Sequence, residues 1–218
     1  MGRNERGLDR FRDFAVATFS SNQGLSNSVV VSLLADLDGS VWIATFGGLN
    51  RWKNGRITTY DKRDGKLGGL APNSLFQDHR GRIWVSTNHE FGYLENDRFI
   101  PLSSIPGGIV YGITEDSAKN LWIANQDHGL IRLSSHGEVQ QIPWASLGHK
   151  DHASALAADP SRGGLWLGFF NGGVSTSQTA KFARRTQLPM GWAMGELRIF
   201  DSILTVPSGP PLRADLAD

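Results

Sequence analysis

Four tryptophans recur along the chain at intervals of about 40 residues, and each lies in the same short phrase. The phrase leads from an aspartate through a turn into a β-rich run around the tryptophan. Residues 36–45, for example, read Asp-Leu-Asp-Gly-Ser-Val-Trp-Ile-Ala-Thr. A period of this length indicates one supersecondary unit that buries its apolar surface against its neighbours. The repeated residues are Trp42, Trp84, Trp122 and Trp166, with Asp36, Asp78, Asp116 and Asp159 before them.

Each phrase has the chemistry of a β-hairpin. Residues 38–39, 80–81 and 162–163 tolerate positive φ between two apolar runs, and Asn120 is the expected substitute in the third copy. The aspartate precedes the tryptophan by six residues in three copies and by seven in the fourth, where the turn has one more residue. Because the strand runs are apolar on alternate and intervening positions, we expect both faces to be buried.

A second turn, a Gly-apolar pair such as Gly48-Leu49, a third turn and a last strand complete each repeat. Four short antiparallel strands with a recurrent Trp are typical of β-propeller blades. We therefore expect an all-β chain with about four blade cores, a partial leading blade and an irregular C-terminal tail. The expected division is 1–22, the second half of a truncated blade; 23–66, 67–104 and 105–147, blades; 148–175, a partial blade; and 176–218, a non-repeat tail.

The tryptophans and aspartates of the phrase are expected to have structural roles. Burying a Trp side chain removes about 150–250 Å² from water, an upper estimate of about 4–6 kcal/mol. We therefore expect the four tryptophans to pack between blades. The fixed place of the aspartates before each turn predicts that they cap turn amides.

The phrase resembles the two-component regulator propeller repeat, whose pattern includes Gly-Leu, Asn-Ser-Val, Asp-Gly, a Trp strand and Gly-Leu-x-Arg. Residues 24–51 match almost all of that pattern, residues 73–87 match its middle, and the likeness extends over about residues 7–175. This resemblance implies a sensory module, usually seven-bladed and extracytoplasmic. It also implies a parent protein in which a membrane helix joins the propeller to a histidine kinase or another output domain.

The repeat pattern is incomplete at both ends. Residues 7–11 repeat the pattern of 48–52, so the chain is expected to begin inside a blade, and the pattern disappears after Val174. With free synonymous codon choice, DNA for residues 201–218 read one nucleotide back can encode Asp-Ser-Asp-Gly-Thr-Leu-Trp-Ala-Ala-Thr-Glu-Gly-Gly-Leu-Ser-Arg. Its Trp codon spans Ser208 and Gly209, in the phase of the next blade after Trp166. We interpret the tail as an out-of-frame translation of a further blade, with a native divergent tail or linker as the alternative.

Composition adds few restrictions. A formal net charge of +1 predicts no nucleic-acid partner, and no apolar run reaches the ~18 residues of a membrane helix. Residues 1–12 contain no signal-peptide core, so the chain as given would stay in the cytoplasm, whereas the parent is extracytoplasmic by resemblance. The absence of cysteine excludes disulfides and thiolate metal sites. We expect no cofactor, and we expect oligomers to form through the exposed terminal blades.

The turns after the tryptophan strands should gather at one end of the propeller, where they combine aromatic, polar and acidic groups. These residues are the candidates for binding a small molecule, a carbohydrate or a protein; the alternative is that they are solvated loop residues or packing aromatics. Their imidazoles and carboxylates could bind a divalent cation, but we expect no metal site and no catalytic residue. The candidates are Phe46, Asn88, His89, Glu90, Gln126, Asp127, His128, Phe169, Phe170 and Asn171.

Three functions therefore stay open. The first is a ligand- or partner-binding sensory propeller, and the second is a protein-interaction scaffold. The third is an enzyme similar to the streptogramin lyases, with His89, Glu90 and His128 as its candidate residues. The other histidines, His79, His136, His149 and His152, share no repeated geometry and receive no role.

Overall fold

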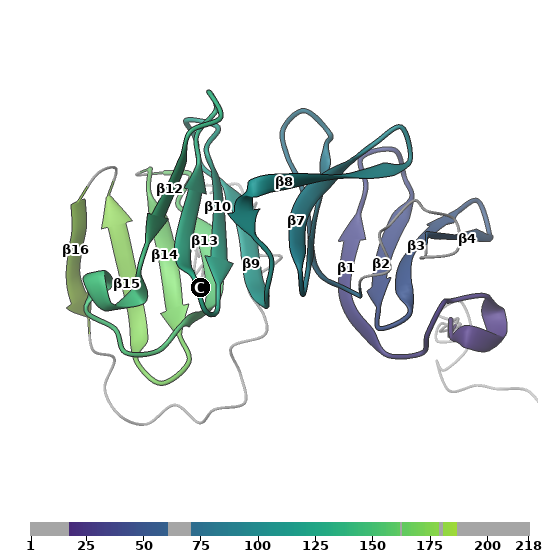
Figure 1. Ribbon diagram of the computed structural model, residues 1–218, viewed down its shortest axis with the longest axis horizontal. Helices are drawn as coiled ribbons and strands as arrows, with labels where there is room; N and C mark the ends of the chain where they lie inside the picture. Colours follow the sequence, from purple (N-terminus) through teal and green to yellow (C-terminus); the bar gives the residue numbers. More distant parts are fainter. Residues whose placement is uncertain (1–17, 61–70, 162, 179–180, 187–218) are drawn as a thin grey trace, which may run out of the picture. The chain divides into compact units, whose positions relative to one another are not determined.

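Each tryptophan phrase lies at the centre of a four-stranded antiparallel sheet (Figure 1). The computed structural model describes residues 18–60, 71–161, 163–178 and 181–186. These residues belong to one compact unit, Met1–Gln187. The strands follow one another in each sheet in the order of the chain, so every neighbouring pair is a hairpin.

The four sheets have the following bounds. The first sheet contains β1 Val30–Ala35, β2 Val41–Thr45, β3 Gly48–Lys53 and β4 Arg56–Tyr60. The second contains β5 Pro72–Gln77, β6 Ile83–Thr87, β7 Glu90–Glu95 and β8 Arg98–Pro106. The third contains β9 Val110–Glu115, β10 Leu121–Asn125, β11 Gly129–Leu133 and β12 Val139–Ile142. The fourth contains β13 Ala153–Ala158, β14 Leu165–Phe169, β15 Gly173–Gln178 and β16 Lys181–Thr186. Among the described residues, the 3-10 turns η2 Ser21–Gln23 and η4 Trp144–Leu147 lie before the first and fourth sheets.

Positive φ angles occur in the turns before the tryptophan strands, as the sequence predicts. Gly39 and Gly81 have φ of 81° and 79°. In the third copy the prediction of Asn120 is wrong, because Lys119 takes the positive φ of 66°. Asn120 instead donates its backbone N–H and its side-chain amide to Asp116, at 2.9 and 2.8 Å, so the amide side chain is used as a donor within the turn.

The fourth sheet continues beyond residue 175, where the expected partial blade ended. Strands β15 and β16 pair in antiparallel, with Ser177 opposite Phe182. Residues 174–177 lack the Asn and Arg that follow Gly48-Leu49 in the first repeat, but the β-branched Val174 and Thr176 suit an extended strand. The expected half-blade in residues 1–17 and the tail from 187 onward lie outside the described residues.

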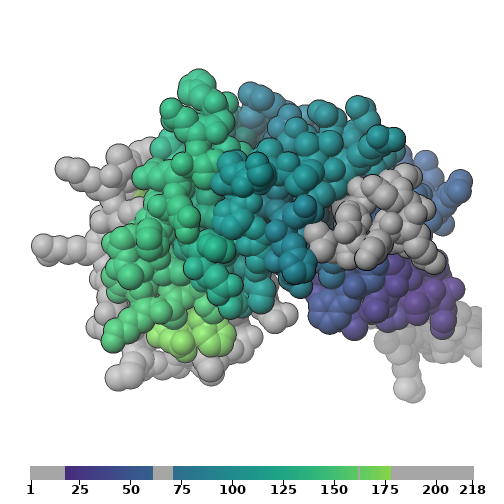
Figure 2. Space-filling model, in the orientation of Figure 1, coloured from purple at the N-terminus to yellow at the C-terminus, as the bar shows by residue number. Residues whose placement is uncertain are grey.

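Successive sheets pack face to face. Strand β1 lies beside β5, β5 beside β9, and β9 beside β13, as do the inner strands of successive propeller blades. Three hydrophobic clusters fill the spaces between the sheets, and each joins the tryptophan-bearing face of one sheet to the sheet that follows. Figure 2 shows the second sheet, coloured blue to teal, meeting the third sheet, coloured teal to green, on one face of the molecule.

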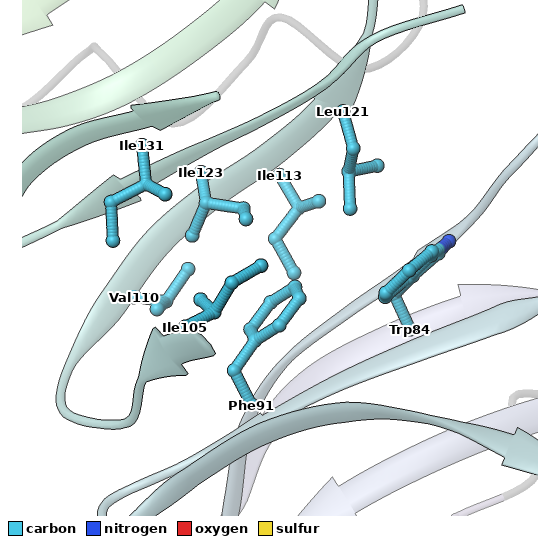
Figure 3. Packing of buried hydrophobic residues seen from close by; sticks show 8 residues of the cluster. All are labelled: Trp84, Phe91, Ile105, Val110, Ile113, Leu121, Ile123 and Ile131. Atoms are coloured by element: carbon cyan, nitrogen blue, oxygen red, sulfur yellow. The ribbon is translucent and has the colours of Figure 1, made fainter. Parts of the chain in front are cut away.

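The second cluster illustrates this packing (Figure 3). Trp84 and Phe91 come from the second sheet, and the ring of Phe91 points toward Ile113 of the third sheet. Ile123 and Phe91 are completely buried. The apolar faces of two sheets therefore form one core, which is the arrangement predicted from the period of the repeat.

The prediction that the strand before each turn and the tryptophan strand are buried on both faces fails at the two ends of the array. Trp42 and Trp84 are 4% and 5% exposed, but Trp166 in the fourth sheet is 44% exposed. In the first sheet, Leu33 of β1 is 64% exposed. Both residues lie on sheet faces that no other described sheet covers.

Candidate functional site

The meander order of the strands separates the turns into two groups. The β1–β2 and β3–β4 turns of a sheet lie at one end, and the β2–β3 turn lies at the other, as do the connections between sheets. We call this second end the mouth. It is formed by the turns after the tryptophan strands, at residues 46–47, 88–89, 126–128 and 170–172.

A buried side chain at the end of each of the first three tryptophan strands holds the mouth turn. The hydroxyl of Thr45 accepts the N–H of Gly47 at 3.2 Å, and that of Thr87 accepts the N–H of Glu90 at 2.9 Å. In the third sheet the amide oxygen of Asn125 accepts the N–H groups of residues 127 and 128. These three side chains are completely buried, so each of these mouth turns is held by a buried side chain. The repeated Thr at the end of the phrase is the sequence signal for this role.

Most of the candidate residues are accessible at the mouth. Phe46 and Phe170 are 63% and 56% exposed. Glu90 and Gln126 are half-buried. The remaining exposed candidates are Asn88, His89, Asp127, His128 and Asn171.

Phe169 does not lie on the surface of the mouth. Its ring is 5% exposed, stacks on His149 and contacts the edge of Trp144, with a centroid separation of 5.7 Å from Trp144. The Nε2 atom of His149 in turn lies 2.9 Å from the hydroxyl of Ser175. Phe169 is therefore a core residue of the fourth sheet, and we remove it from the candidate ligand contacts.

Sequence reasoning missed an aromatic stack that crosses the mouth between the third and fourth sheets. The ring of His152 lies between those of Tyr111 and Phe170, with centroid distances of 4.7 Å to Tyr111 and 5.6 Å to Phe170. The hydroxyl of Tyr111 donates to Oε1 of Gln126 at 2.9 Å. Tyr111 and His152 lie outside the repeated phrase, so the period carried no signal for them. The stack brings together three flat rings and an amide from two sheets.

The acidic and imidazole residues of the mouth do not assemble into a metal centre. In the described part of the chain, no group of three or more His, Asp or Glu side chains could hold a metal ion. His89, Glu90 and His128 contribute backbone groups to the turns: their N–H groups donate to Thr87 and Asn125, and the carbonyl oxygens of Glu90 and His128 accept from Thr87 and Gln141. Within the described residues the turns are thus held by the backbone groups of these three residues.

The opposite end carries the repeated aspartates, each of which accepts the indole N–H of its tryptophan. The distances are 2.8 Å for Asp36–Trp42, 2.9 Å for Asp78–Trp84, 2.8 Å for Asp116–Trp122 and 3.2 Å for Asp159–Trp166. The second carboxylate oxygen accepts a turn amide in every copy. One aspartate therefore fixes both the turn and the orientation of the tryptophan.

The hydrogen bonds to these aspartates affect their acidity. Burial by itself would raise the pKa of Asp36 and Asp116, but hydrogen bonds outweigh it and hold each pKa below its ordinary value. The donors are chiefly Trp42 and Gln77 for Asp36, and Asn120 and Trp122 for Asp116. The carboxylates are therefore ionised in the folded state at neutral pH.

A hollow of about 150 Å³ lies at the same end, between the second and third sheets. Its lining includes His79, whose Nδ1 lies 2.5 Å from Oε1 of Glu115, and whose backbone N–H donates to the other carboxylate oxygen at 3.0 Å. The imidazole and the carboxylate thus bind each other across the interface between the two sheets.

No helix in the described residues has the length and hydropathy to cross a bilayer.

Comparison with known proteins gives a family-model match over a short segment and a shared fold. Residues 66–89 match the two-component regulator propeller repeat, and no curated protein sequence matches the chain. Among solved structures, the extracellular domain of a B. thetaiotaomicron protein assigned as a hybrid two-component system has a TM-score of 0.61 at 22% identity. The match covers 74% of this chain and 25% of that domain. Virginiamycin B lyase from Staphylococcus aureus gives a TM-score of 0.55 at 22% identity, covering 73% of this chain and 56% of the lyase.

These likenesses show the β-propeller fold of the four sheets. The chain spans about a quarter of the two-component domain and just over half of the lyase. At such identities the shared fold carries no activity from one protein to the other.

Proposed function

Because the chain carries a two-component regulator propeller repeat, we propose that it is a sensory, ligand-binding part of a signal-transduction protein. In this role the mouth binds a small molecule or a carbohydrate, and the propeller passes the binding energy to an output domain elsewhere in the parent protein. The module works outside the cytoplasm, as the extracellular domains of similar fold do. It binds its ligand without catalysing a reaction.

The aromatic stack at the mouth is the observation that supports this proposal best. Tyr111 and Phe170 are 42% and 56% exposed although aromatic rings gain stability by burial. Ligand sites combine apolar and aromatic surfaces with a few placed polar groups, and Gln126 supplies such a group beside Tyr111. A sugar ring presents an apolar face for stacking and hydroxyls for the amide, so its chemistry suits this surface.

Saturation-transfer NMR with a panel of neutral and acidic oligosaccharides tests the proposal. We expect at least one member to bind, and Tyr111→Ala and Phe170→Ala to weaken that binding about tenfold or more. Leu37→Ala is the matched control, because Leu37 is 82% exposed in the β1–β2 turn at the opposite end. Binding that survives both aromatic substitutions, or a panel without any binder, would contradict a carbohydrate site at the mouth.

A lyase-like activity is the second candidate, because the fold is shared with virginiamycin B lyase. It would depend on His89, Glu90 and His128. Incubation with a streptogramin B antibiotic followed by liquid chromatography should give no new product. A product that disappears in His128→Ala would replace the sensory proposal by an enzymatic one.

We also propose that the parent sequence continues in another reading frame near the C-terminus. The support is the blade phrase hidden in residues 201–218, whose Trp codon falls 42 positions after Trp166. Sequencing the coding DNA tests this directly. If the codons do not encode the phrase in the shifted frame, the proposal is wrong and the tail is a native sequence.

A further inference from the structure

The chain contains three copies of one type of interface between successive sheets. On one side lies the tryptophan-bearing face of a sheet, and on the other lie the first two strands of the next sheet. Leu75 of β5 and Ile113 of β9 occupy the same receiving position in two of these interfaces, and each is 9% exposed. In these two interfaces the residue is therefore nearly removed from water, and its equivalent in the third interface, Leu156, is partly buried.

In the first sheet, the face that would pack against the tryptophan-bearing face of a preceding sheet is exposed. Leu33 pairs with Ile43 in the register in which Leu75 pairs with Val85, so Leu33 and Leu75 are equivalent. Leu33 is nevertheless 64% exposed. Val31, the unpaired residue at the irregularity between Val30 and Ser32 of β1, is also exposed, at 39%.

In the fourth sheet, the tryptophan-bearing face is exposed. Trp166 is 44% exposed, whereas the equivalent Trp42 and Trp84 are 4% and 5% exposed. Ala157, which lies opposite Trp166 in the sheet, is also exposed. Small residues beside the tryptophan leave its ring accessible to another sheet.

We propose that copies of this chain associate head to tail, with the Trp166 face of one copy packed on the Leu33 face of the next. The two faces are the halves of an interface that the chain already forms three times, so a second copy supplies the matching surface to each. An association of this kind uses different surfaces on the two partners, and it either closes into a ring or continues as an open chain. It is independent of ligand binding at the mouth.

Sedimentation velocity of the full chain over a range of concentrations tests the proposal. We expect concentration-dependent association of the natural sequence, and monomers for both Leu33→Asp and Trp166→Asp, because a carboxylate at either face is desolvated without a partner. Both positions are exposed, so both variants should keep the circular dichroism of the parent chain. Leu37→Asp is the control, and it should associate like the parent chain because Leu37 lies in the β1–β2 turn, outside both faces.

A mixture of the two variants distinguishes this arrangement from a symmetric one. Each variant keeps one intact face, so equal amounts of Leu33→Asp and Trp166→Asp should form a one-to-one dimer that grows no further. A natural sequence that stays monomeric would overturn the proposal. So would a Trp166→Asp variant that still associates alone, or a mixture that remains monomeric.

Discussion

Trp84 and Trp166 occupy the same position in two sheets, yet one is buried and the other is half exposed. Both indoles donate to the aspartate of their own phrase, at 2.9 and 3.2 Å. Trp84 also packs in a cluster with the third sheet, whereas Trp166 lies on a sheet face that no described sheet follows. The difference shows that the phrase itself builds the turn and orients the ring, and that the neighbouring sheet supplies the burial.

Truncating these two tryptophans should give the largest difference in stability. Trp84→Ala leaves a cavity between two sheets and should lower the free energy of unfolding by about 3–5 kcal/mol. Trp166→Ala should lower it by less than about 1 kcal/mol, because the ring is already in contact with water. Chemical denaturation followed by circular dichroism measures both, at a concentration at which the chain is monomeric. Equal losses would mean that the sheets do not support each other through the tryptophan faces.

Substituting the aspartates that accept the indole N–H groups of these two tryptophans should lower the free energy of unfolding in the same order, by smaller amounts. Asp78 is 8% exposed, and its carboxylate accepts the indole of Trp84 and the N–H groups of Arg80 and Arg82. Asp78→Ala leaves these donors without a charged acceptor and should cost about 1.5–3 kcal/mol. Asp159→Ala should cost less, because its bond to Trp166 is exposed and longer. A larger loss from Asp159→Ala in the same denaturation experiment would reverse the proposed order.

Acid should weaken the first and third sheets through the carboxylates of Asp36 and Asp116. The pKa values of Asp36 and Asp116 are lower in the folded chain than in the unfolded one. Their contribution is therefore complete above the unfolded pKa of about 3.9 and is lost as the pH falls through the lower folded pKa. Denaturation midpoints measured from about pH 6 down to pH 3 should fall at the acid end. Asp116→Asn should flatten that fall, and an unchanged slope would contradict the role given to Asp116.

The smallest effects are expected at the mouth. The side chain of His89 is exposed, and only its backbone N–H takes part in the turn, through Thr87. His89→Ala should therefore change the free energy of unfolding by no more than about 0.5 kcal/mol. Phe169→Ala, in the buried layer beneath the mouth, should cost several times more in the same assay. A large loss from His89→Ala would place its side chain in the packing of the turn.

The sequence predicted the features that repeat and missed those that do not. The period and turn chemistry correctly predicted four-stranded propeller sheets, because every blade must solve the same packing problem with the same residues. The fixed spacing of Asp and Trp marked both residues, but the indole–carboxylate bond depends on how the turn folds back over the strand. It persists in the fourth sheet despite the additional turn residue before Trp166.

Most of the candidate site depended on contacts between repeats. Tyr111 lies in β9 of the third sheet and His152 lies just before β13 of the fourth, and neither belongs to the repeated phrase. Phe169 and Phe170 are adjacent aromatics that the sequence could not distinguish. Their alternation across strand β14 and its turn buries Phe169 and exposes Phe170.

Hydroxyl-radical footprinting of the tryptophans, read out by mass spectrometry on the monomeric chain, tests the central claim most directly. If tryptophan faces join successive sheets and the fourth face is open, Trp166 should oxidise several times faster than Trp42 and Trp84. Equal oxidation rates at the three tryptophans would contradict the account, because they would show that the sheets are not packed face to face.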